Sequence, residues 1–472
     1  MRVLLVSHNF LPAHAAGTEV YTGQLALGLR ELGHEVTVLA AEKDVGRADM
    51  SIVRREWEGL PVVEITNNLY HREFRETWDN PRVDALFERE LERLRPDVVH
   101  FQHLLYLSSG CVRSAARSGA AVLFTLHDFW LHCARFGQRL HPDGGLCARI
   151  EFERCGTCLS TFKFRQTAIE RVTGRALSVL RKGTGVDLSA AARKAAKGLR
   201  LGGVPQGDAW ESADAGAAAE MTRAASERDS SLRERVVPHV QRFLAPSRFL
   251  VERFIEWGIE PARIEHLPTG LDLSRFASQL RVRAAGTSTP LRVGFLGTLA
   301  PHKGPQLLLE AWARLSASTR ARASLEVRGR PPSDAVFGRR LEQLAAVAGA
   351  TLPGPLSRGD VPRWLAGLDL LVVPSLWYEN APMVILEALA LRTPLLVTDL
   401  GGMAELVEPG TSGARFPVGD VAALTAALAE LLDAPERLAR LYPRGAIAAD
   451  LATNTRRLEQ LYRELRTTVA DP

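Results

Sequence analysis

The feature that most constrains the fold of this sequence is a strand–loop–helix order that begins twice, at the first residues and again near residue 290. Arg2–Ser7 is a short continuous apolar run, as expected of a strand buried on both faces of a parallel sheet. Apolar residues then recur every three or four positions from Tyr21 to Leu32, which is one face of a helix, and a strand follows at Glu35–Ala40. Such alternation predicts an α/β protein with parallel sheets covered by helices.

The second start has the same order. A strand at Leu291–Leu296 is followed by a loop at Gly297–Gly304 and a helix at Pro305–Leu315 that has proline in its opening turn. Further strands are expected at Ala323–Val327, Leu368–Val373 and Pro394–Thr398. Two separate starts predict two sheets and therefore two domains.

The domain limits follow from the polar stretch Ala277–Pro290 between the two starts. The chain of 472 residues suits two large domains. We expect domains at residues 1–276 and 290–450, and a closing amphipathic helix within 451–472. Residues 161–235 do not follow the alternation and are interpreted as an insertion in the first domain, partly helical.

Composition excludes several classes of protein. Hydrophobic residues are 46% and charged residues 24%, which rules out a collagen-like, disulfide-scaffold or wholly disordered chain. No apolar run approaches the roughly 18 residues of a membrane-spanning helix, and the run before Ser7 is too short for a secretory signal. A cytoplasmic protein is therefore expected. The net charge of +5 suits an acidic partner without choosing among nucleic acid, phosphorylated metabolites and anionic lipid.

The loops after strands are the expected ligand sites of parallel α/β sheets. Glu379 and Glu387 lie eight positions apart, before and within a helix expected to begin at Pro382. Exposed N–H groups near Asn380 and Ala381 would favour a phosphate or sugar oxygen, and carboxylates accept hydrogen bonds from hydroxyls. The alternative is a solvated Glu379 and an incidental Glu387.

Three further loops carry weaker signals. Gly297–Gly304 is glycine-rich with Lys303 at a helix start, a phosphate cradle in outline but not a Walker A motif; a surface lysine is the alternative. Gly17, at the start of the first helix, allows close approach of a ligand, or makes an ordinary turn. His127 directly follows a predicted strand, where it is either structural or a donor to a substrate oxygen.

Several of these motifs together resemble the donor-binding half of glycosyltransferase family 4. The residues that carry the resemblance are Pro374-Ser375, Glu379, Glu387, Gly401-Gly402-Met403-Ala404-Glu405-Leu406-Val407, Gly410 and Gly413. Leu32-Gly33-His34-Glu35-Val36 is similar to the family's opening segment. The resemblance implies a GT-B fold, in which two Rossmann-like domains face each other across a cleft. It also implies sugar transfer from a nucleotide sugar, with retention of configuration, to a glycan or lipid-linked acceptor.

The resemblance also implies roles for single residues. Lys303 would contact the diphosphate, Glu379 the hydroxyls of the transferred sugar, and Glu387 the ribose. Gly17 would let the first loop meet the phosphate, His127 would contact the sugar's hydroxymethyl oxygen, and Gly354 lies where the family places the base.

Two departures from the family pattern are visible. Thr298 stands where the family often has an arginine, and Arg328 or Arg330 is a candidate substitute. Pro382 stands where many members have glycine. The chain has no D-x-D pair to hold a metal, so transfer is expected to be metal-independent, with Lys303 and backbone amides meeting the leaving-group charge.

Four of the five cysteines crowd into one short segment, 133–158. Cys133, Cys147, Cys155 and Cys158 end in C-x-x-C, and four thiolates can hold a structural zinc ion. The alternative is ordinary buried thiols. Cys111, in a predicted helix, is expected in the core.

The segment from Lys163 to Arg200 is basic, with only Glu170 and Asp187 opposing. It would rest on anionic lipid as a peripheral membrane contact, or form a solvated helical face. Aromatic residues are sparse there after Phe164, so nucleic-acid binding is not expected. For the whole chain, a nucleotide-sugar epimerase and a catalytically silent sugar-nucleotide-binding protein remain alternatives. The base, sugar, acceptor, linkage and oligomeric state stay open.

Overall fold

The computed structural model describes residues 1–184, 215–279, 290–332, 334–441 and 448–470. Parts of the predicted insertion and of the predicted domain boundary, residues 185–214 and 280–289, lie outside the described residues. The chain forms two compact units. The first unit holds residues 1–244, 255–265 and 457–472, and the second holds 245–254 and 266–456.

The first unit is built on an eight-stranded sheet of order β3-β4-β2-β1-β5-β6-β7-β8. Its strands are β1 (Arg2–Ser7), β2 (Glu35–Glu42), β3 (Ile52–Trp57), β4 (Leu60–Thr66), β5 (Val98–Phe101), β6 (Ala121–Thr125), β7 (Arg242–Ala245) and β8 (Ile264–His266). Pairing is parallel from β4 through β7, and β3 is antiparallel to β4. The expected buried parallel sheet is therefore present.

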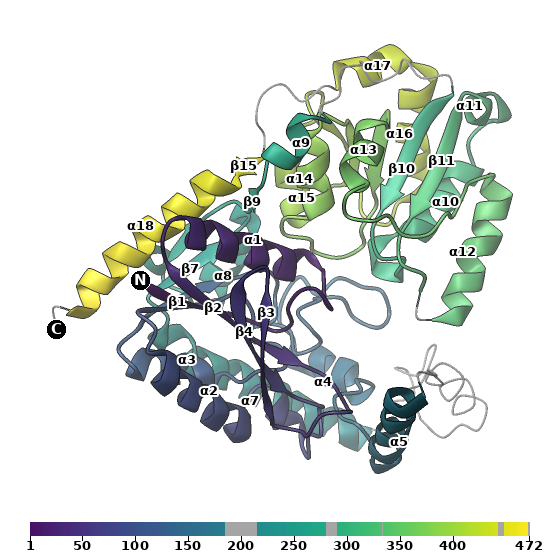
Figure 1. The fold of residues 1–472 in the computed structure, drawn as a ribbon. Helices are drawn as coiled ribbons and strands as arrows, with labels where there is room; N and C mark the ends of the chain where they lie inside the picture. The colour runs from purple at the N-terminus through teal and green to yellow at the C-terminus, as the bar shows by residue number, and fades with distance from the viewer. Residues whose placement is uncertain (185–214, 280–289, 333, 442–447, 471–472) are drawn as a thin grey trace. The chain divides into compact units, whose positions relative to one another are not determined.

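Helices cover both faces of this sheet. Figure 1 shows α1 on one face and α2 and α3 on the other, as right-handed crossovers require when the chain steps to opposite sides of β1. The helices of this unit are α1 (Gly17–Glu31), η1 (Phe74–Thr77), α2 (Pro81–Leu94), α3 (Gly110–Arg117), α4 (Phe152–Ser160), α5 (Ala168–Thr184), α7 (Ala215–Arg235), η2 (Val237–His239) and η3 (Pro261–Arg263). Helix α8 (Arg248–Trp257) has residues in both units. Cys111 on α3 is fully buried, as predicted.

The second unit holds a five-stranded parallel sheet of order β11-β10-β12-β13-β14. Its strands are β10 (Leu291–Leu296), β11 (Ala323–Arg328), β12 (Leu370–Val373), β13 (Leu395–Thr398) and β14 (Gly413–Phe416), and a separate pair joins β9 (Gly270–Leu271) to β15 (Ala449–Asp450). The helices are α9 (Ser274–Ala277), η4 (Pro301–Lys303), α10 (Pro305–Ala313), α11 (Ala317–Ala321), α12 (Ala335–Ala348), α13 (Val361–Ala366), α14 (Met383–Ala390), α15 (Gly401–Leu406), α16 (Val421–Asp433) and α17 (Pro435–Arg440).

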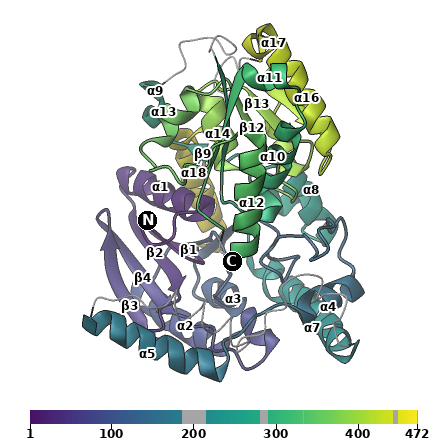
Figure 2. The same ribbon diagram turned by 90° about the vertical axis from the view of Figure 1, so that its right-hand side faces the viewer.

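Two hydrophobic cores cover the two faces of the five-stranded sheet. Along β12 the side chains alternate: Leu370 and Val372 pack with α10, α12 and α16, whereas Leu371 and Val373 pack with α13, α14 and α15. These helix groups lie on opposite sides of the sheet in Figures 1 and 2. A strand buried on both faces must be apolar throughout, which is why the sequence shows continuous apolar runs here.

The last helix, α18 (Leu451–Ala470), begins in the second unit and continues into the first. Its residues Leu458, Leu461 and Tyr462 are fully buried. The Tyr462 hydroxyl lies 2.6 Å from Nδ1 of His100 on β5, and burial lowers the pKa of His100 to about 3. At the helix surface Arg457 pairs with Glu265 at 2.9 Å. Most of α18 is therefore a structural part of the first unit. Among the described residues, no helix combines the length and apolarity needed to cross a bilayer.

Candidate functional site

Strand order brings two predicted residues together in the second unit. Strand β10 pairs with β11 on one side and β12 on the other, so the connection from β10 to β11 and the connection from β12 to β13 run in opposite directions along the sheet. Ligands of open parallel sheets bind beyond the strand carboxyl ends at such a switch point. Lys303 lies on the connection after β10 and Glu379 on the connection after β12. Lys303 Nζ lies 2.5 Å from Glu379 Oε1.

Glu379 is held as a buried carboxylate. Its side chain is 10% exposed, and the Ser375 hydroxyl donates to the same oxygen at 2.9 Å. Burial alone would raise the pKa of Glu379, but the Lys303 ammonium and hydrogen bonds to the carboxylate outweigh it and lower the pKa. The Lys303 ammonium also lies 4.9 Å from the centre of the Trp377 ring. The site thus presents a localised cation beside an ionised acid.

Close backbone approach explains two glycines around this pair. Gly304 has φ +71°, and a Cβ there would lie 1.9 Å from the Pro374 carbonyl oxygen. A Cβ on Gly402 would lie 1.8 Å from the Asn380 carbonyl oxygen, and the Gly402 N–H donates to the Glu379 carbonyl at 2.9 Å. No side chain fits at either place, so these glycines let neighbouring loops pack against the loop that carries Glu379.

Glu387 lies on α14, which begins at Met383 rather than at the predicted Pro382; the proline occupies the position before the first helical residue. Burial raises the pKa of Glu387 to about 7, although the Arg358 and Arg275 guanidinium groups act against burial. Asn380 is buried and Ala381 is half-buried, in the turn before α14.

Gly354 lies in the loop after β11 and α12, at φ +86°. A Cβ there would meet no atom within 4 Å, so the backbone borders open space. The predicted substitutes for the arginine missing at Thr298 differ in surroundings. Arg328 already pairs with Glu326 and lies over the Trp364 ring at 6.0 Å, whereas Arg330 is exposed.

Gly17 and His127 belong to the first unit. Gly17 is exposed at the first residue of α1. His127 follows β6; its Nε2 lies 2.8 Å from Oε1 of Gln102, and its ring meets Tyr21 edge-on at 5.5 Å. Burial and neighbouring His103 lower the pKa of His127 to about 3, so it is neutral at pH 7. These two residues share the carboxyl edge of the first sheet, whereas Lys303, Glu379 and Glu387 belong to the second.

The same edge of the first unit holds a histidine network that the sequence did not predict. His8 Nε2 lies 3.2 Å from Oε1 of the buried Glu19, and the His8 and His103 ring centres are 4.4 Å apart. The Leu105 N–H donates to His103 Nδ1 at 2.9 Å, so His103 Nε2 carries the proton that it donates to Asp128 at 3.0 Å. His8 directly follows β1, and His103 lies two residues after β5. This position at strand ends is the sequence signal that could have indicated the network.

The four clustered cysteines line one cavity of the first unit. All four are free, and burial raises the pKa of Cys155 to about 12, with the thiols of Cys133, Cys158 and Cys147 adding to the rise. As the side chains lie, no group of three or more His, Cys, Asp or Glu in the described residues is arranged to hold a metal ion. The zinc site stays a prediction.

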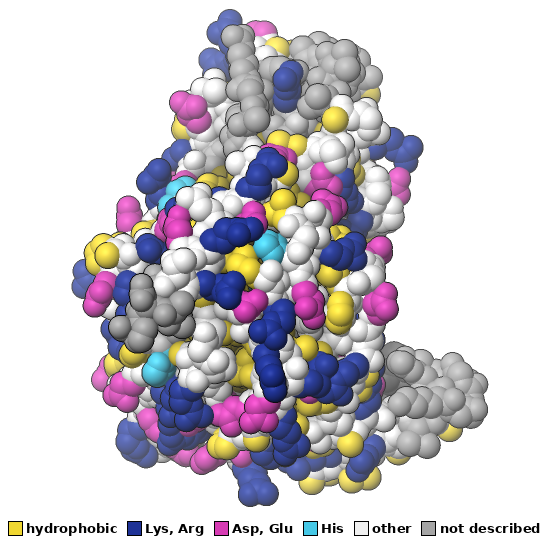
Figure 3. All heavy atoms as spheres, turned by 60° about the vertical axis from the view of Figure 1, so that its left-hand side comes forward, with side chains coloured by type: hydrophobic (Ala, Val, Ile, Leu, Met, Phe, Trp, Pro, Cys, Tyr) yellow, Lys and Arg dark blue, Asp and Glu magenta, His cyan; other side chains and the backbone are white. Residues whose placement is uncertain are grey.

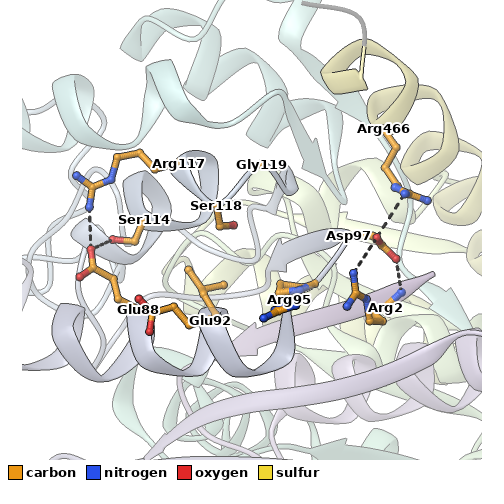
Figure 4. Close-up of a pocket in the computed structure, with 12 residues that line it drawn as sticks. Arg2, Glu88, Glu92, Arg95, Asp97, Ser114, Arg117, Ser118, Gly119 and Arg466 are labelled. Atoms are coloured by element: carbon orange, nitrogen blue, oxygen red, sulfur yellow. Dashed lines mark hydrogen bonds and ion pairs between the residues drawn. The ribbon is translucent and has the colours of Figure 1, made fainter.

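A pocket of about 880 Å³ lies at the opposite edge of the first sheet, near the amino ends of β1, β5 and β6. Figure 4 shows Asp97 there between Arg2 and Arg466, and Arg117 bonded to Glu88 at 2.8 Å. Carboxylates thus already face most of its cations. Figure 3 likewise shows Lys and Arg side chains interspersed with Asp and Glu over one face. Neither surface has the uniform charge of a phosphate-binding groove.

Two Rossmann-like parallel-sheet units, with a lysine–carboxylate pair at the switch point of the second, define the GT-B class of fold. Comparison with known proteins agrees. Residues 15–156 match the family model "Glycosyltransferase Family 4", and residues 280–447 match "Glycosyl transferases group 1". Together these two matches confirm the resemblance to glycosyltransferase family 4 that the sequence shows.

The chain is similar to curated proteins in sequence and to solved structures in fold. A D-inositol 3-phosphate glycosyltransferase from Geodermatophilus obscurus is 34% identical over 43% of this chain and 49% of its own. An alpha-D-kanosaminyltransferase from Streptomyces kanamyceticus is 30% identical over 40% and 49%. The matches thus span about half the length of these curated relatives. Anabaena HepE, solved with UDP and glucose, has a TM-score of 0.61 at 15% identity over 98% of this chain and 100% of that one. Sucrose-phosphate synthase from Thermosynechococcus elongatus has a TM-score of 0.62 at 17% identity, covering 99% of each chain.

Proposed function

We propose that this protein is a retaining glycosyltransferase that moves a sugar from a nucleotide-sugar donor to a glycan or lipid-linked acceptor. The observation that carries the proposal is the Lys303–Glu379 pair at the switch point of the second unit. A nucleotide sugar needs a cation for its diphosphate and an acceptor of hydrogen bonds for its hydroxyls. This pair supplies both from neighbouring loops.

Lys303 would contact the diphosphate. When the glycosidic bond breaks, negative charge grows on the leaving phosphate, and a positioned ammonium stabilises that charge most in a site shielded from water. Glu379 keeps Lys303 in place before the donor arrives, since their separation is 2.5 Å. The phosphate then takes over the ammonium's hydrogen bonds, and the carboxylate is released toward sugar hydroxyls.

Glu387 would accept hydrogen bonds from the ribose, and the open backbone at Gly354 would meet the base. A carboxyl group with a pKa of about 7 is half-ionised near neutrality. Vicinal hydroxyls donate best to an ionised carboxylate, so ribose binding would favour the ionised form of Glu387. The predicted roles of Gly17 and His127 stay predictions.

We infer that transfer does not require a divalent metal ion. The sequence has no D-x-D pair, and Lys303, with the N–H groups of the turn before α14, offers the positive charge that a metal would otherwise supply. A chelation experiment tests this inference.

Relatives indicate the classes of donor to try first. HepE was solved with UDP-glucose, which makes uridine diphosphate sugars the first candidates here. One named relative is a D-inositol 3-phosphate glycosyltransferase and another an alpha-D-kanosaminyltransferase, so an inositol phosphate is a trial acceptor and a kanosaminyl nucleotide a trial donor.

A thermal-shift panel of nucleotide sugars tests the proposal, because a ligand that binds the folded state raises the melting temperature. We expect at least one nucleotide sugar to raise it in the parent chain. The shift should disappear in Lys303→Ala and persist in Lys163→Ala, which alters the exposed Lys163–Glu170 pair instead. No shift with any nucleotide sugar would contradict the proposal. A shift without sugar transfer to any acceptor would favour a silent sugar-nucleotide-binding protein, and a new sugar nucleotide formed from donor alone would favour an epimerase.

A further inference from the structure

Helix α5 is attached to the first unit by its small and polar side. Gly174 faces the unit, since a Cβ there would lie 3.8 Å from Val45. The Arg171 guanidinium lies over the Tyr70 ring at 4.9 Å. Glu170 pairs with Lys163 and accepts from the Thr167 N–H at 2.9 Å. Figures 1 and 2 show α5 at the periphery of this unit.

The side of α5 that faces away from the unit is apolar. Val172 is 71% exposed, Ile169 58% and Leu180 41%, and Ala176 is also exposed. Positions 169, 172, 176 and 180 follow at steps of three and four, so they form one stripe along the helix. Three of the eight large hydrophobic side chains exposed in the described residues belong to this stripe. An amphipathic helix normally turns its apolar face inward, and this one does the reverse.

Positive charge flanks the apolar stripe. Arg175 is exposed on the same helix, and Arg165, exposed three residues before the helix, donates to the Arg72 carbonyl at 2.7 Å. From Lys163 to Arg200 the sequence has only Glu170 and Asp187 as acidic residues. Such charge disfavours pairing of this face with the same face of a second copy, because the cations would repel. A surface that is apolar within and anionic at its boundary satisfies both features at once, and a bilayer with anionic lipid is such a surface.

We propose that α5 is a membrane-docking helix that lies in the plane of an anionic bilayer. Ile169, Val172 and Leu180 enter the boundary between headgroups and acyl chains, while Arg165 and Arg175 contact lipid phosphates. The proposal does not depend on sugar transfer, since its readout is binding to lipid. It gives α5 and the residues just before it one partner and identifies the side chains that contact it.

Vesicle flotation of the full chain tests the apolar stripe. We expect binding to vesicles of phosphatidylcholine mixed with phosphatidylglycerol, and much weaker binding to phosphatidylcholine alone. The variant Ile169→Asp/Val172→Asp/Leu180→Asp should bind at least about tenfold more weakly, because three apolar contacts are lost and like charge is added. The matched control Val336→Asp/Val347→Asp, at positions on α12 that are 60% and 69% exposed, should bind like the parent.

A second pair of variants tests the charge. Arg165→Gln/Arg175→Gln should lose about tenfold in binding to the anionic vesicles, at about 1 kcal/mol for each cation near the surface. The control Arg117→Gln/Arg363→Gln removes two exposed arginines elsewhere and should bind like the parent. Circular dichroism checks that each variant is folded. Equal binding by the stripe variant and its parent would overturn the proposal. So would parent self-association, measured by light scattering, that the stripe variant abolishes.

Discussion

Replacing Lys303 with alanine removes the cation that lies 2.5 Å from the Glu379 carboxylate. Glu379 would then keep its hydrogen bond from Ser375 at 2.9 Å but lose its counterion. Because its side chain is only 10% exposed, the stranded carboxylate would be poorly hydrated.

The structure limits the cost of this substitution. Breaking one partner out of a buried ion pair costs about 3–5 kcal/mol. Glu379 can avoid part of this cost by taking up a proton, which removes the uncompensated charge. From the ordinary glutamate pKa of 4.5, protonation at pH 7 costs about 3.4 kcal/mol, at about 1.4 kcal/mol per pH unit. We therefore expect Lys303→Ala to lower the free energy of unfolding by about 3 kcal/mol at pH 7.

This loss should shrink as the pH falls. In the parent the pKa of Glu379 is lowered, so its contribution to stability is present at neutral pH and fades in acid as the carboxylate takes up a proton. In the parent this loss begins only below the ordinary glutamate pKa of 4.5. In the variant, burial without a counterion raises the pKa of the same carboxyl, so proton uptake between pH 7 and pH 5 adds stability to the variant while the parent keeps its own. The two unfolding curves should therefore converge between pH 7 and pH 5.

Urea unfolding measured at both pH values checks the reasoning. The double variant Lys303→Ala/Glu379→Gln removes the stranded charge and should recover most of the lost stability. Lys163→Ala, which breaks a more exposed pair, should cost less than about 1 kcal/mol. If Lys303→Ala unfolds at the parent's urea midpoint, or if the double variant is no more stable than the single one, the buried pair does not act as described.

Catalysis gives an independent measure on the same variants. Loss of one preorganised donor to a developing charge lowers turnover about 10²–10³-fold, and we expect this for Lys303→Ala. The double variant should regain stability without regaining turnover. An unchanged rate in Lys303→Ala would remove Lys303 from the mechanism.

Three further outcomes are expected. Chelation with EDTA should leave sugar transfer intact, and a loss that Mg²⁺ or Mn²⁺ specifically restores would contradict metal-independent transfer. Nucleotide-sugar affinity should weaken as the pH falls below about 7, because burial raises the pKa of Glu387 and acid protonates it. Measured by calorimetry, the affinity of Glu387→Gln should not change with pH in this range. If the variant and the parent have the same pH profile, Glu387 does not bind the ribose. Elemental analysis should find one zinc per chain if the clustered thiols hold the metal, and a sub-stoichiometric amount would end that prediction. These thiols are Cys133, Cys147, Cys155 and Cys158.

The two sheets were predictable because their strands have a local signature. A strand buried on both faces must be apolar at every position, and this is a property of short windows such as Leu291–Leu296. Ends of elements were less predictable. Pro382 suits a first helical position, yet its φ of −59° and ψ of 121° place it just before the helix, so the predicted start was one residue early.

Partners within the site could not be predicted in the same way. Lys303 and Glu379 are 76 positions apart, and both were expected to meet a ligand. That they meet each other follows from the strand order, in which β12 lies beside β10 with β11 on the far side. The pair His103–Asp128 was missed for the same reason: the two residues meet only because β5 and β6 stand side by side. His8 and Glu19 instead meet within the single connection from β1 into α1.

The outward-facing apolar stripe of α5 shows a further limit of prediction from sequence. Spacing predicts that its apolar residues share a face, but not which face touches the protein. The structure settles this: position 174 faces Val45, where an added Cβ would lie at the ordinary contact distance of 3.8 Å.

The packing of α18 in the first unit has consequences for folding during synthesis and for truncation of the chain. The strand that carries His100 is made early in synthesis, but its partner Tyr462 is translated some 362 positions later. Until then the ribosome-bound first unit exposes the apolar surface that α18 covers, and His100 lacks its tyrosine hydroxyl. A truncated chain that stops after β8 would keep that surface exposed permanently, and any chimera that exchanges the second unit should retain the native segment from Arg457 onward.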